Sequence, residues 1–269
     1  MYRILKQILI AVIFFSAIGL AIYFGFIKKE PTCFDGIQNQ GEQGIDCGGP
    51  CEDCPIPPPP VEDLKVISAE AVLSGQNFYD LIAKIKNSNS DYGANLIGYD
   101  FKIYGEQNSL ISKKSGKTFI LPGETKYIIE PFISSEKISR TVLSFSDIEW
   151  QRLKVYEEPE IIIGQKTYQN LAGDPYYGEA SGVAINKSVY DFDKILINVV
   201  LLGEDKNILG AGSIELLTMF SGQERYFNIH WPYPIRCAVS SMEMQAETNV
   251  FDLENFMKRH GTNEQFQQY

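Results

Sequence analysis

The stretch that most directly indicates the fold is Leu81-Ile82-Ala83-Lys84-Ile85-Lys86-Asn87. Apolar and polar residues alternate over its second half, up to the asparagine. Alternate side chains of a β-strand point to opposite faces of a sheet, so this pattern predicts a strand with one buried face. Phe101-Lys102-Ile103-Tyr104 and Lys126-Tyr127-Ile128-Ile129 show similar patterns, with turn residues between them such as Asn87-Ser88-Asn89-Ser90. Residues 62–250 contain no stretch with the period of an amphipathic helix. The chain is therefore expected to be all-β after its N-terminal segment.

The strand landmarks occur twice in the same order and at a nearly constant offset. The corresponding segments are Ile85-Lys86-Asn87 and Ala184-Ile185-Asn186, Ile103-Tyr104-Gly105-Glu106 and Leu201-Leu202-Gly203-Glu204, Leu121-Pro122-Gly123-Glu124-Thr125-Lys126-Tyr127 and Phe220-Ser221-Gly222-Gln223-Glu224-Arg225-Tyr226, and Arg140-Thr141-Val142-Leu143-Ser144 and Arg236-Cys237-Ala238-Val239-Ser240. Self-similarity of this kind predicts two tandem domains, at residues 62–153 and 154–250.

These landmarks resemble the FxLYD-type family of Ig-like β-sandwiches, which occur in extracytoplasmic prokaryotic proteins. Phe101-Lys102-Ile103-Tyr104-Gly105 and Pro122-Gly123-Glu124 match the strand and the turn of that family, and Val199-Val200-Leu201-Leu202-Gly203 and Ser221-Gly222-Gln223 match more loosely. Glycine replaces the aspartate of the family pattern in both copies. The resemblance implies two tandem Ig-like antiparallel β-sandwiches that act as interaction modules, and it transfers no site.

The N-terminal segment predicts a membrane anchor. Residues 8–27 carry no charge, and twenty helical residues at about 1.5 Å each cover the roughly 30 Å hydrocarbon core of a bilayer. We expect residues 8–27 to contact membrane lipid, within an anchor of residues 1–30 that has a short cytoplasmic tip. A cleaved signal peptide is the alternative, because Gly19-Leu20-Ala21 is a small-x-small triplet, but the apolar run is longer than a typical signal core.

Charge restricts the class of partner. The net charge is -10, and Arg3, Lys6, Lys28 and Lys29 flank the apolar run, so the remaining chain is still more acidic than the whole. Nucleic acid is therefore not expected as a partner, since a phosphate backbone needs a basic footprint.

A cysteine-rich collar follows at residues 31–54, with Cys33, Cys47, Cys51 and Cys54 among glycines and acids. This segment has too few apolar residues for a core, so two disulfides are expected to hold it, in any of three pairings. Disulfides require an oxidising compartment, which places the bulk of the chain outside the cytoplasm and the N-terminus inside. The order of residues resembles short cysteine modules of microbial secreted and surface proteins. The prolines of residues 55–61 then predict an extended spacer.

The collar also offers candidate metal ligands. Asp35, Asn39, Glu42 and Asp46 are hard oxygen donors among glycines, which makes calcium the candidate cofactor. A solvated, disulfide-stapled loop is the simpler interpretation. Zinc on the four thiolates is a third, although the spacing lacks the paired knuckles of common zinc ribbons.

Aromatic residues supply the remaining candidate site. Tyr168, Tyr176 and Tyr177 are expected in a loop before the main strands of the second domain, where exposed aromatics mark protein or glycan contacts. Cys237 alternates with Val239 and is expected to be a buried strand residue. The tail at residues 251–269 is expected to form a short helix and then to be disordered.

No catalytic motif is recognisable, and the chain is not expected to be an enzyme. It has two histidines, of which His230 is expected at the end of a strand beside Trp231. The predicted function is that of a single-pass, cell-membrane-anchored protein that displays two Ig-like modules to another envelope or surface protein. A calcium-dependent surface module and an envelope hydrolase are the alternatives.

Overall fold

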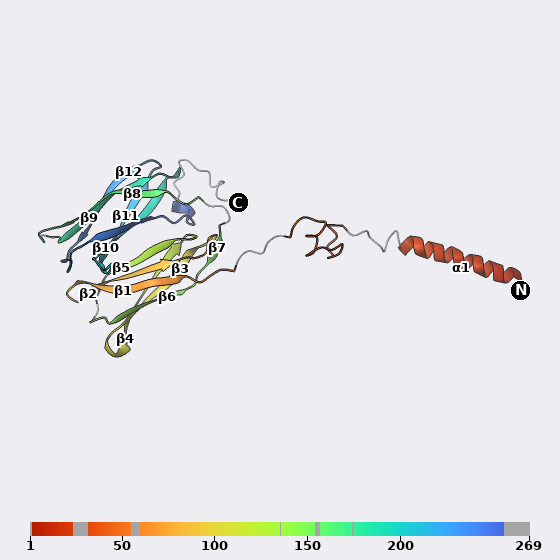
Figure 1. The fold of residues 1–269 in the computed structure, drawn as a ribbon, viewed down its shortest axis with the longest axis horizontal. Coiled ribbons are helices and arrows are strands. Elements are labelled where there is room, and N and C mark those ends of the chain that lie inside the picture. The colour runs from red at the N-terminus through yellow and green to blue at the C-terminus, as the bar shows by residue number, and fades with distance from the viewer. Residues whose placement is uncertain are drawn as a thin grey trace. The chain divides into compact units, whose positions relative to one another are not determined.

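A computed structural model describes residues 2–23, 32–54, 60–134, 136–153, 157–173 and 175–255, without the side chains of residues 132 and 134. The chain divides into two compact units, one up to residue 60 and one from residue 61 onward (Figure 1). Most of the predicted proline spacer, and the part of the predicted tail beyond residue 255, lie outside the described residues.

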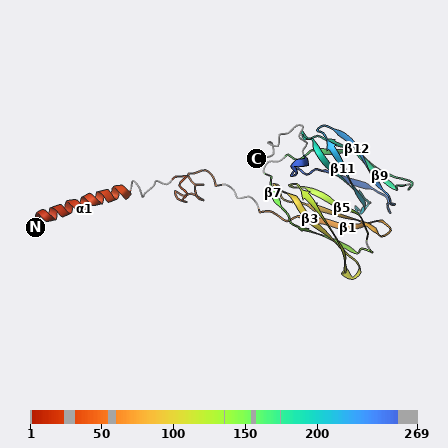
Figure 2. The ribbon, with the colours of Figure 1, turned by 180° about the vertical axis from the view of Figure 1, so that it is seen from behind.

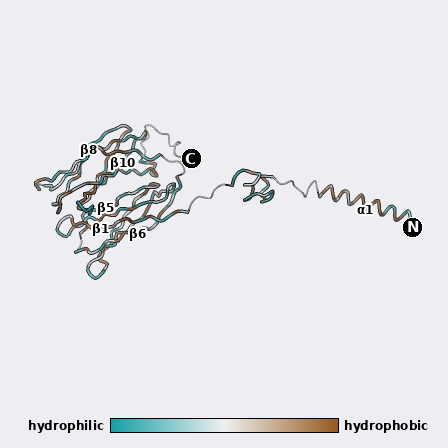
Figure 3. The backbone as a smooth tube through the Cα atoms, in the orientation of Figure 1, coloured by the Kyte–Doolittle hydropathy of each residue, from teal (hydrophilic) through white to brown (hydrophobic). Residues whose placement is uncertain are grey.

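The first unit contains helix α1 (Tyr2–Ile22), in which no residue is buried. Figure 3 shows hydrophobic residues along most of this helix. Among the described residues, α1 is the one helix long and apolar enough to cross a membrane, a criterion that a signal sequence would also meet. The described part of the predicted span is therefore helical, and the helix begins earlier than the uncharged run of residues 8–27.

The second unit begins with two antiparallel sheets that face each other, here called the first sheet pair. One sheet has the order β1-β2-β5 and consists of β1 (Lys65–Gly75), β2 (Phe78–Lys86) and β5 (Thr125–Ser134). The other has the order β4-β3-β6, with a short strand paired to β3, and consists of β3 (Tyr92–Tyr104), β4 (Leu110–Ile120), β6 (Arg140–Ser146) and β7 (Trp150–Arg152). Side chains from both sheets fill a common core that includes Leu81, Ile85, Phe101 and Leu143.

A second sheet pair follows with the same connectivity. One sheet has the order β12-β9-β8 and consists of β8 (Ile161–Asn170), β9 (Gly178–Asn186) and β12 (Glu224–Trp231). The other has the order β11-β10-β13 and consists of β10 (Phe192–Leu202), β11 (Ile208–Met219) and β13 (Ser241–Glu247). Its separate core includes Ala184, Ile197, Phe227 and Trp231. Figures 1 and 2 view the unit from opposite sides, and both show β1, β3 and β5 on one side and β9, β11 and β12 on the other.

The expectation of an all-β fold after an N-terminal helix is confirmed. The helical elements in the described part of this unit are the single 3-10 turns Glu106–Asn108 and Leu253–Asn255. The second of these turns lies where a short helix was expected. The definition of each sheet pair as one Ig-like domain, with boundaries at 62–153 and 154–250, stays a prediction.

The two copies of the asparagine landmark adopt the same local structure. Asn87 directly follows the last residue of β2 and is fully buried, and its Nδ2 donates to the carbonyl oxygens of Tyr92 and Leu121 at 2.6 and 2.9 Å. Asn186 ends β9, is likewise fully buried, and donates to the carbonyls of Tyr190 and Met219 at 2.8 and 3.3 Å. In both copies a buried side-chain amide therefore donates to one carbonyl four or five residues later in the chain and to one at the end of the facing sheet, which satisfies its own buried N–H groups.

The following turn is also shared by the two copies. The Glu124 carboxylate accepts from the Leu121 N–H at 2.7 Å, and the Gln223 side chain accepts from the Phe220 N–H at 2.9 Å. A side-chain oxygen therefore closes each turn on the residue three positions earlier. Local hydrogen bonding explains why this landmark is recognisable in the sequence twice.

The fourth landmark was matched wrongly. Residues 236–240 form bends and irregular chain, and the strand equivalent to β6 is β13, which begins at Ser241. The register shows the true correspondence, because Tyr104 pairs with Arg140 and Leu202 pairs with Ser241. Cys237 is consequently exposed and not a buried strand residue. Pro232 and Pro234 precede this segment and lack the N–H groups that a ladder needs.

Candidate functional site

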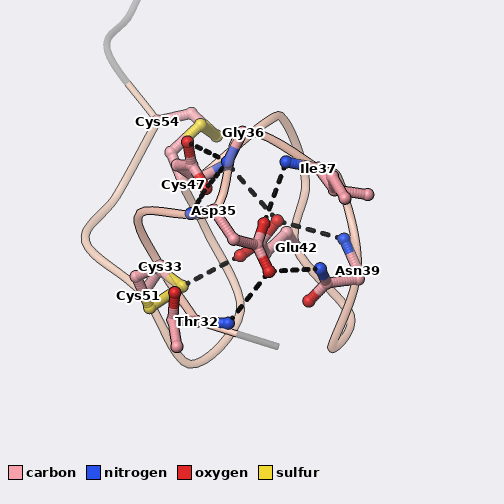
Figure 4. Close-up of a disulfide and its surroundings, with 11 residues drawn as sticks. Thr32, Cys33, Asp35, Gly36, Ile37, Asn39, Glu42, Cys47, Cys51 and Cys54 are labelled. Carbon is pink, nitrogen blue, oxygen red and sulfur yellow. Dashed lines mark hydrogen bonds between the residues drawn. A yellow bond between two sulfur atoms is a disulfide. The ribbon is translucent and has the colours of Figure 1, made fainter. Parts of the chain in front are cut away.

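The collar is a knot of irregular chain held by two disulfides (Figure 4). Cys33 bonds to Cys51 and Cys47 bonds to Cys54, with S–S distances of 2.01 and 2.12 Å. None of its large apolar side chains is buried, and Phe34 is 93% exposed. Because closing a loop of about 15 residues by a disulfide stabilises a fold by roughly 3 kcal/mol in the chain-entropy model, the covalent links take the place of a core here. The four cysteines are thus disulfide partners, as expected.

The acidic residues of the knot bind its own backbone. The carboxylate of Asp46 accepts from the N–H groups of Asp35 and Gly36 at 3.0 Å. The carboxylate of Asp35 accepts from Ile37 N–H at 2.9 Å (Figure 4). Glu42 is buried, and its Oε2 accepts from the N–H groups of Asn39 and Asp46 at 3.1 and 3.3 Å. Carboxylates in such turns replace the hydrogen bonds that strands or helices would supply.

These bonds engage carboxylate oxygens of Asp35, Glu42 and Asp46 that the calcium hypothesis requires. The side-chain oxygen of Asn39, the fourth candidate ligand, is buried without a hydrogen-bond partner among the described residues. Within the described residues, the one group of three acidic, cysteine or histidine side chains close enough to share an ion is Cys33, Glu42 and Cys51. Both sulfurs of that group are in one disulfide, whereas a cysteine binds a metal ion only as a free thiolate. Calcium binding by Asp35, Asn39, Glu42 and Asp46 stays a prediction, and the hydrogen bonds favour a stapled loop.

The three tyrosines do not lie together in a loop as expected. Tyr168 is in β8, where its ring meets Trp231 edge-on at 6.2 Å between centroids. Tyr176 and Tyr177 lie in the loop between β8 and β9, and each is 38% exposed. Tyr177 N–H donates to the carbonyl of Trp231, which fixes this loop on the end of β12. The expected loop therefore contains two of the three tyrosines, and the third, Tyr168, lies in the strand before it.

His230 belongs to a polar cluster beside that loop. It lies in β12, and its Nε2 is 2.7 Å from the Glu179 carboxylate of β9. The Tyr176 ring stacks on the imidazole at 4.4 Å between centroids, and Gln169 Nε2 donates to Glu179 at 3.1 Å. A hydrolase that uses His230 to activate a serine or cysteine nucleophile would need that hydroxyl or thiol bonded to this histidine. Among the described residues the bonds of His230 and Glu179 lead only to each other and to Gln169.

An interface between the two sheet pairs was not expected from the sequence. Apolar side chains of β2 and β5 meet those of β10 and β11 in a third buried cluster, made of Ile82, Tyr127, Val200, Leu202 and Ala211. Hydrogen bonds frame it, because the side chain of Gln245 in β13 accepts from Tyr127 N–H at 3.2 Å and donates to the carbonyl of Thr125 at 3.2 Å. The outer face of sheet β1-β2-β5 thus packs on the outer face of sheet β11-β10-β13.

Two ion pairs cross this interface. Lys126 of β5 pairs with Glu247 of β13, and their side chains are 3% and 2% exposed. Lys84 of β2 pairs with Glu243 at 2.8 Å, and Tyr127 Oη donates to the same carboxylate at 2.9 Å. The hydrogen bond from Lys84 lowers the pKa of Glu243 more than partial burial raises it. The Lys126–Glu247 pair is the buried one, and breaking a buried ion pair is costly. This pair therefore fixes the two sheet pairs against each other.

Nothing in the sequence marked these interface residues. Lys84 and Lys126 stand at polar positions of alternating strands and are indistinguishable there from solvated lysines. The chain matches no protein-family model, and no curated protein is significantly similar to it.

Proposed function

We propose that this chain is a membrane-anchored, non-catalytic protein that displays its β-sheet unit outside the cytoplasm for scaffolding, adhesion or envelope assembly. The observation that carries the proposal is the disulfide-stapled knot, at residues 32–54, shortly after the apolar helix α1. Disulfides persist in oxidising compartments, so α1 directs the following chain out of the cytoplasm.

The interface between the sheet pairs supports a scaffolding role. Two Ig-like modules connected by a flexible joint would reorient independently. In this chain a shared apolar cluster and a buried ion pair join the two sheet pairs. Loops and sheet faces are then presented in fixed relative positions to a partner. Rigidity of this kind lowers the entropy cost of binding.

The calcium and hydrolase alternatives have weaker support. The knot acids bind backbone N–H groups, and the Glu179–His230 pair has no bonded nucleophile among the described residues. Fold analogy adds nothing to either alternative, because activity belongs to sites.

The test is the topology of the full chain in its native cell. Carbonate extraction should leave it in the membrane pellet, and protease added to intact cells should remove the β-sheet unit. Release of the chain by carbonate would point to a cleaved leader, and protection from protease until the membrane is opened would contradict the proposed orientation.

A further inference from the structure

The two copies of the repeat differ at two of the connections between their strands. The other three connections have the same length in both copies, namely residues 87–91 and 187–191, 105–109 and 203–207, and 121–124 and 220–223. By contrast, only Gln76 and Asn77 join β1 to β2, whereas residues 171–177 join β8 to β9. Residues 232–240, which join β12 to β13, likewise form a longer connection than residues 135–139, which join β5 to β6. The copies have therefore diverged at two places while the other connections kept their length.

The short hairpin of the first copy and the long loop of the second copy meet at a cleft of about 490 Å³. The hairpin contributes Leu73, Gln76, Asn77 and Tyr79 to its lining, and the loop contributes Tyr233 and Arg236. The volume is within the range of about 300–1,000 Å³ that is usual for ligand pockets. The cleft thus lies where a departure from the repeat in each copy comes together.

The loop is fixed against the first sheet pair beside this cleft. Tyr233 and Asp80 of β2 are both buried, and the Tyr233 hydroxyl donates to the Asp80 carboxylate. Pro232 and Pro234 flank Tyr233, and proline restricts the backbone to a narrow range of φ. A ligand would therefore meet a preformed wall, which lowers the entropy cost of binding.

The cleft carries one accessible charge, and that charge is positive. No acidic residue lines it, because Asp80 is buried and bonded to Tyr233. Arg236 is exposed, and within the described residues its guanidinium has no hydrogen bond or ion pair. A guanidinium presents a planar fork of donors, to which a carboxylate binds by two parallel hydrogen bonds. In a chain of net charge -10, an unpaired arginine in a cleft without acids favours a ligand with a negative group.

The remaining lining favours a single carboxylate on an apolar body. Leu73, Tyr79 and Tyr233 supply apolar and aromatic surface, and the side-chain amides of Gln76 and Asn77 can bond both the N–H and the C=O of a peptide group. A polyanion would be repelled by the acidic remainder of the chain, and one arginine is a small footprint for it. The C-terminus of a polypeptide combines a single carboxylate, a side chain and an adjacent peptide group.

We propose that this cleft binds the C-terminal residues of a partner protein, with the terminal carboxylate on Arg236. An apolar last side chain packs against Leu73 and Tyr79, and the amides of Gln76 and Asn77 bond the last peptide group. This inference rests on the proposed function, because it describes how the displayed unit recognises another envelope or surface protein.

The test is binding of short fluorescent peptides to the full chain in detergent micelles, measured by fluorescence polarisation. The peptides end in leucine, phenylalanine, aspartate or lysine, and each is made both as the free carboxylate and as the C-terminal amide. Peptides with an apolar last residue and a free carboxylate should bind, and their amides should bind about tenfold or more weakly.

Exposed residues inside and outside the cleft provide matched variants. Arg236→Gln should weaken binding by about tenfold or more, and Arg140→Gln on β6 should leave it unchanged. Gln76→Glu places a negative charge in the cleft and should also weaken binding, whereas Gln165→Glu on β8 should not. All four side chains are exposed, so loss of the fold does not explain a difference within either pair.

Equal binding of carboxylate and amide peptides, an equal loss in Arg236→Gln and Arg140→Gln, or no binding would overturn the proposal. Binding of N-acetylleucine or of galacturonate oligomers as tightly as the best peptide would also overturn it, and would assign the cleft to a small carboxylate or to an acidic saccharide. Carbonate extraction and protease accessibility test the proposed function separately, so a failure of this inference leaves their results unchanged.

Discussion

Replacing Lys126 by methionine tests whether the two sheet pairs form one cooperative unit. The substitution keeps most of the length of the unbranched side chain and leaves the Glu247 carboxylate without its cation at a position that is 2% exposed. Glu247 retains the bond from Asn198 Nδ2 at 2.8 Å, but a neutral amide does not compensate a buried charge. Removing one partner of a buried ion pair costs about 3–5 kcal/mol, and loss of the cation 3.9 Å above the Phe119 ring adds to that.

Urea unfolding followed by tryptophan fluorescence measures this effect in both halves. Trp150 packs against the core of the first sheet pair and Trp231 is buried in the second, so single Trp→Phe variants report each half separately. In the parent chain the two transitions should coincide, and in Lys126→Met they should move to lower urea and separate. The double variant Lys126→Met/Glu247→Gln should recover most of the loss, because no unpaired charge remains. A loss in Lys126→Met below about 1 kcal/mol, the value of an exposed pair, would refute the argument.

Three further predictions concern single residues. Burial raises the pKa of Glu124 above its usual value against the opposing effect of Lys126, so the folded state loses stability when this carboxyl ionises. Glu124→Gln, which copies Gln223, should therefore stabilise the chain at neutral pH and raise its urea midpoint. The difference in midpoint should disappear as the pH falls below about 4, where the carboxyl is protonated in both states. A difference that does not change with pH would contradict the raised pKa of Glu124. Asn186 begins an Asn-Lys-Ser sequon but is fully buried, so expression in a glycosylating host should add no mass there, and Asn186→Ala should cost about 1–3 kcal/mol in thermal unfolding. Gly49 has φ +64°, and an added Cβ would lie 2.5 Å from the Gly41 carbonyl oxygen, so Gly49→Ala should give mispaired disulfides in peptide maps where Gln40→Ala does not.

The strands that have one buried face were predictable from the sequence. Leu81, Ala83 and Ile85 point into a core and alternate with residues on the outer face, so the period of two is visible without any structure. The shared turn was predictable for a related reason, because Asn87 and Glu124 satisfy local backbone groups and recur with their counterparts in the second copy. Local hydrogen bonding restricts residue type more strongly than general packing does.

Predictions from the sequence were wrong where the local alternation of residues disagrees with the pairing of distant strands. Cys237 and Val239 alternate like strand residues, but the ladder partner of Leu202 is Ser241, and only the register between distant strands reveals this. The interface could not be predicted at all, since Lys126 and Glu247 are separated by most of the second sheet pair in sequence. Their burial depends on the packing of two outer faces, and neither face is apolar enough for a sequence pattern to mark it.

The most direct test of the central claim is labelling of Cys237 in intact cells with a maleimide that does not cross membranes. Cys237 is exposed and free, whereas the other four cysteines are in disulfides. We expect one label per full-length chain without reductant, located at residue 237, and four further labels only after reduction and unfolding. Labelling that requires an opened membrane, or five reactive thiols before reduction, would contradict the extracytoplasmic orientation on which the proposed function depends.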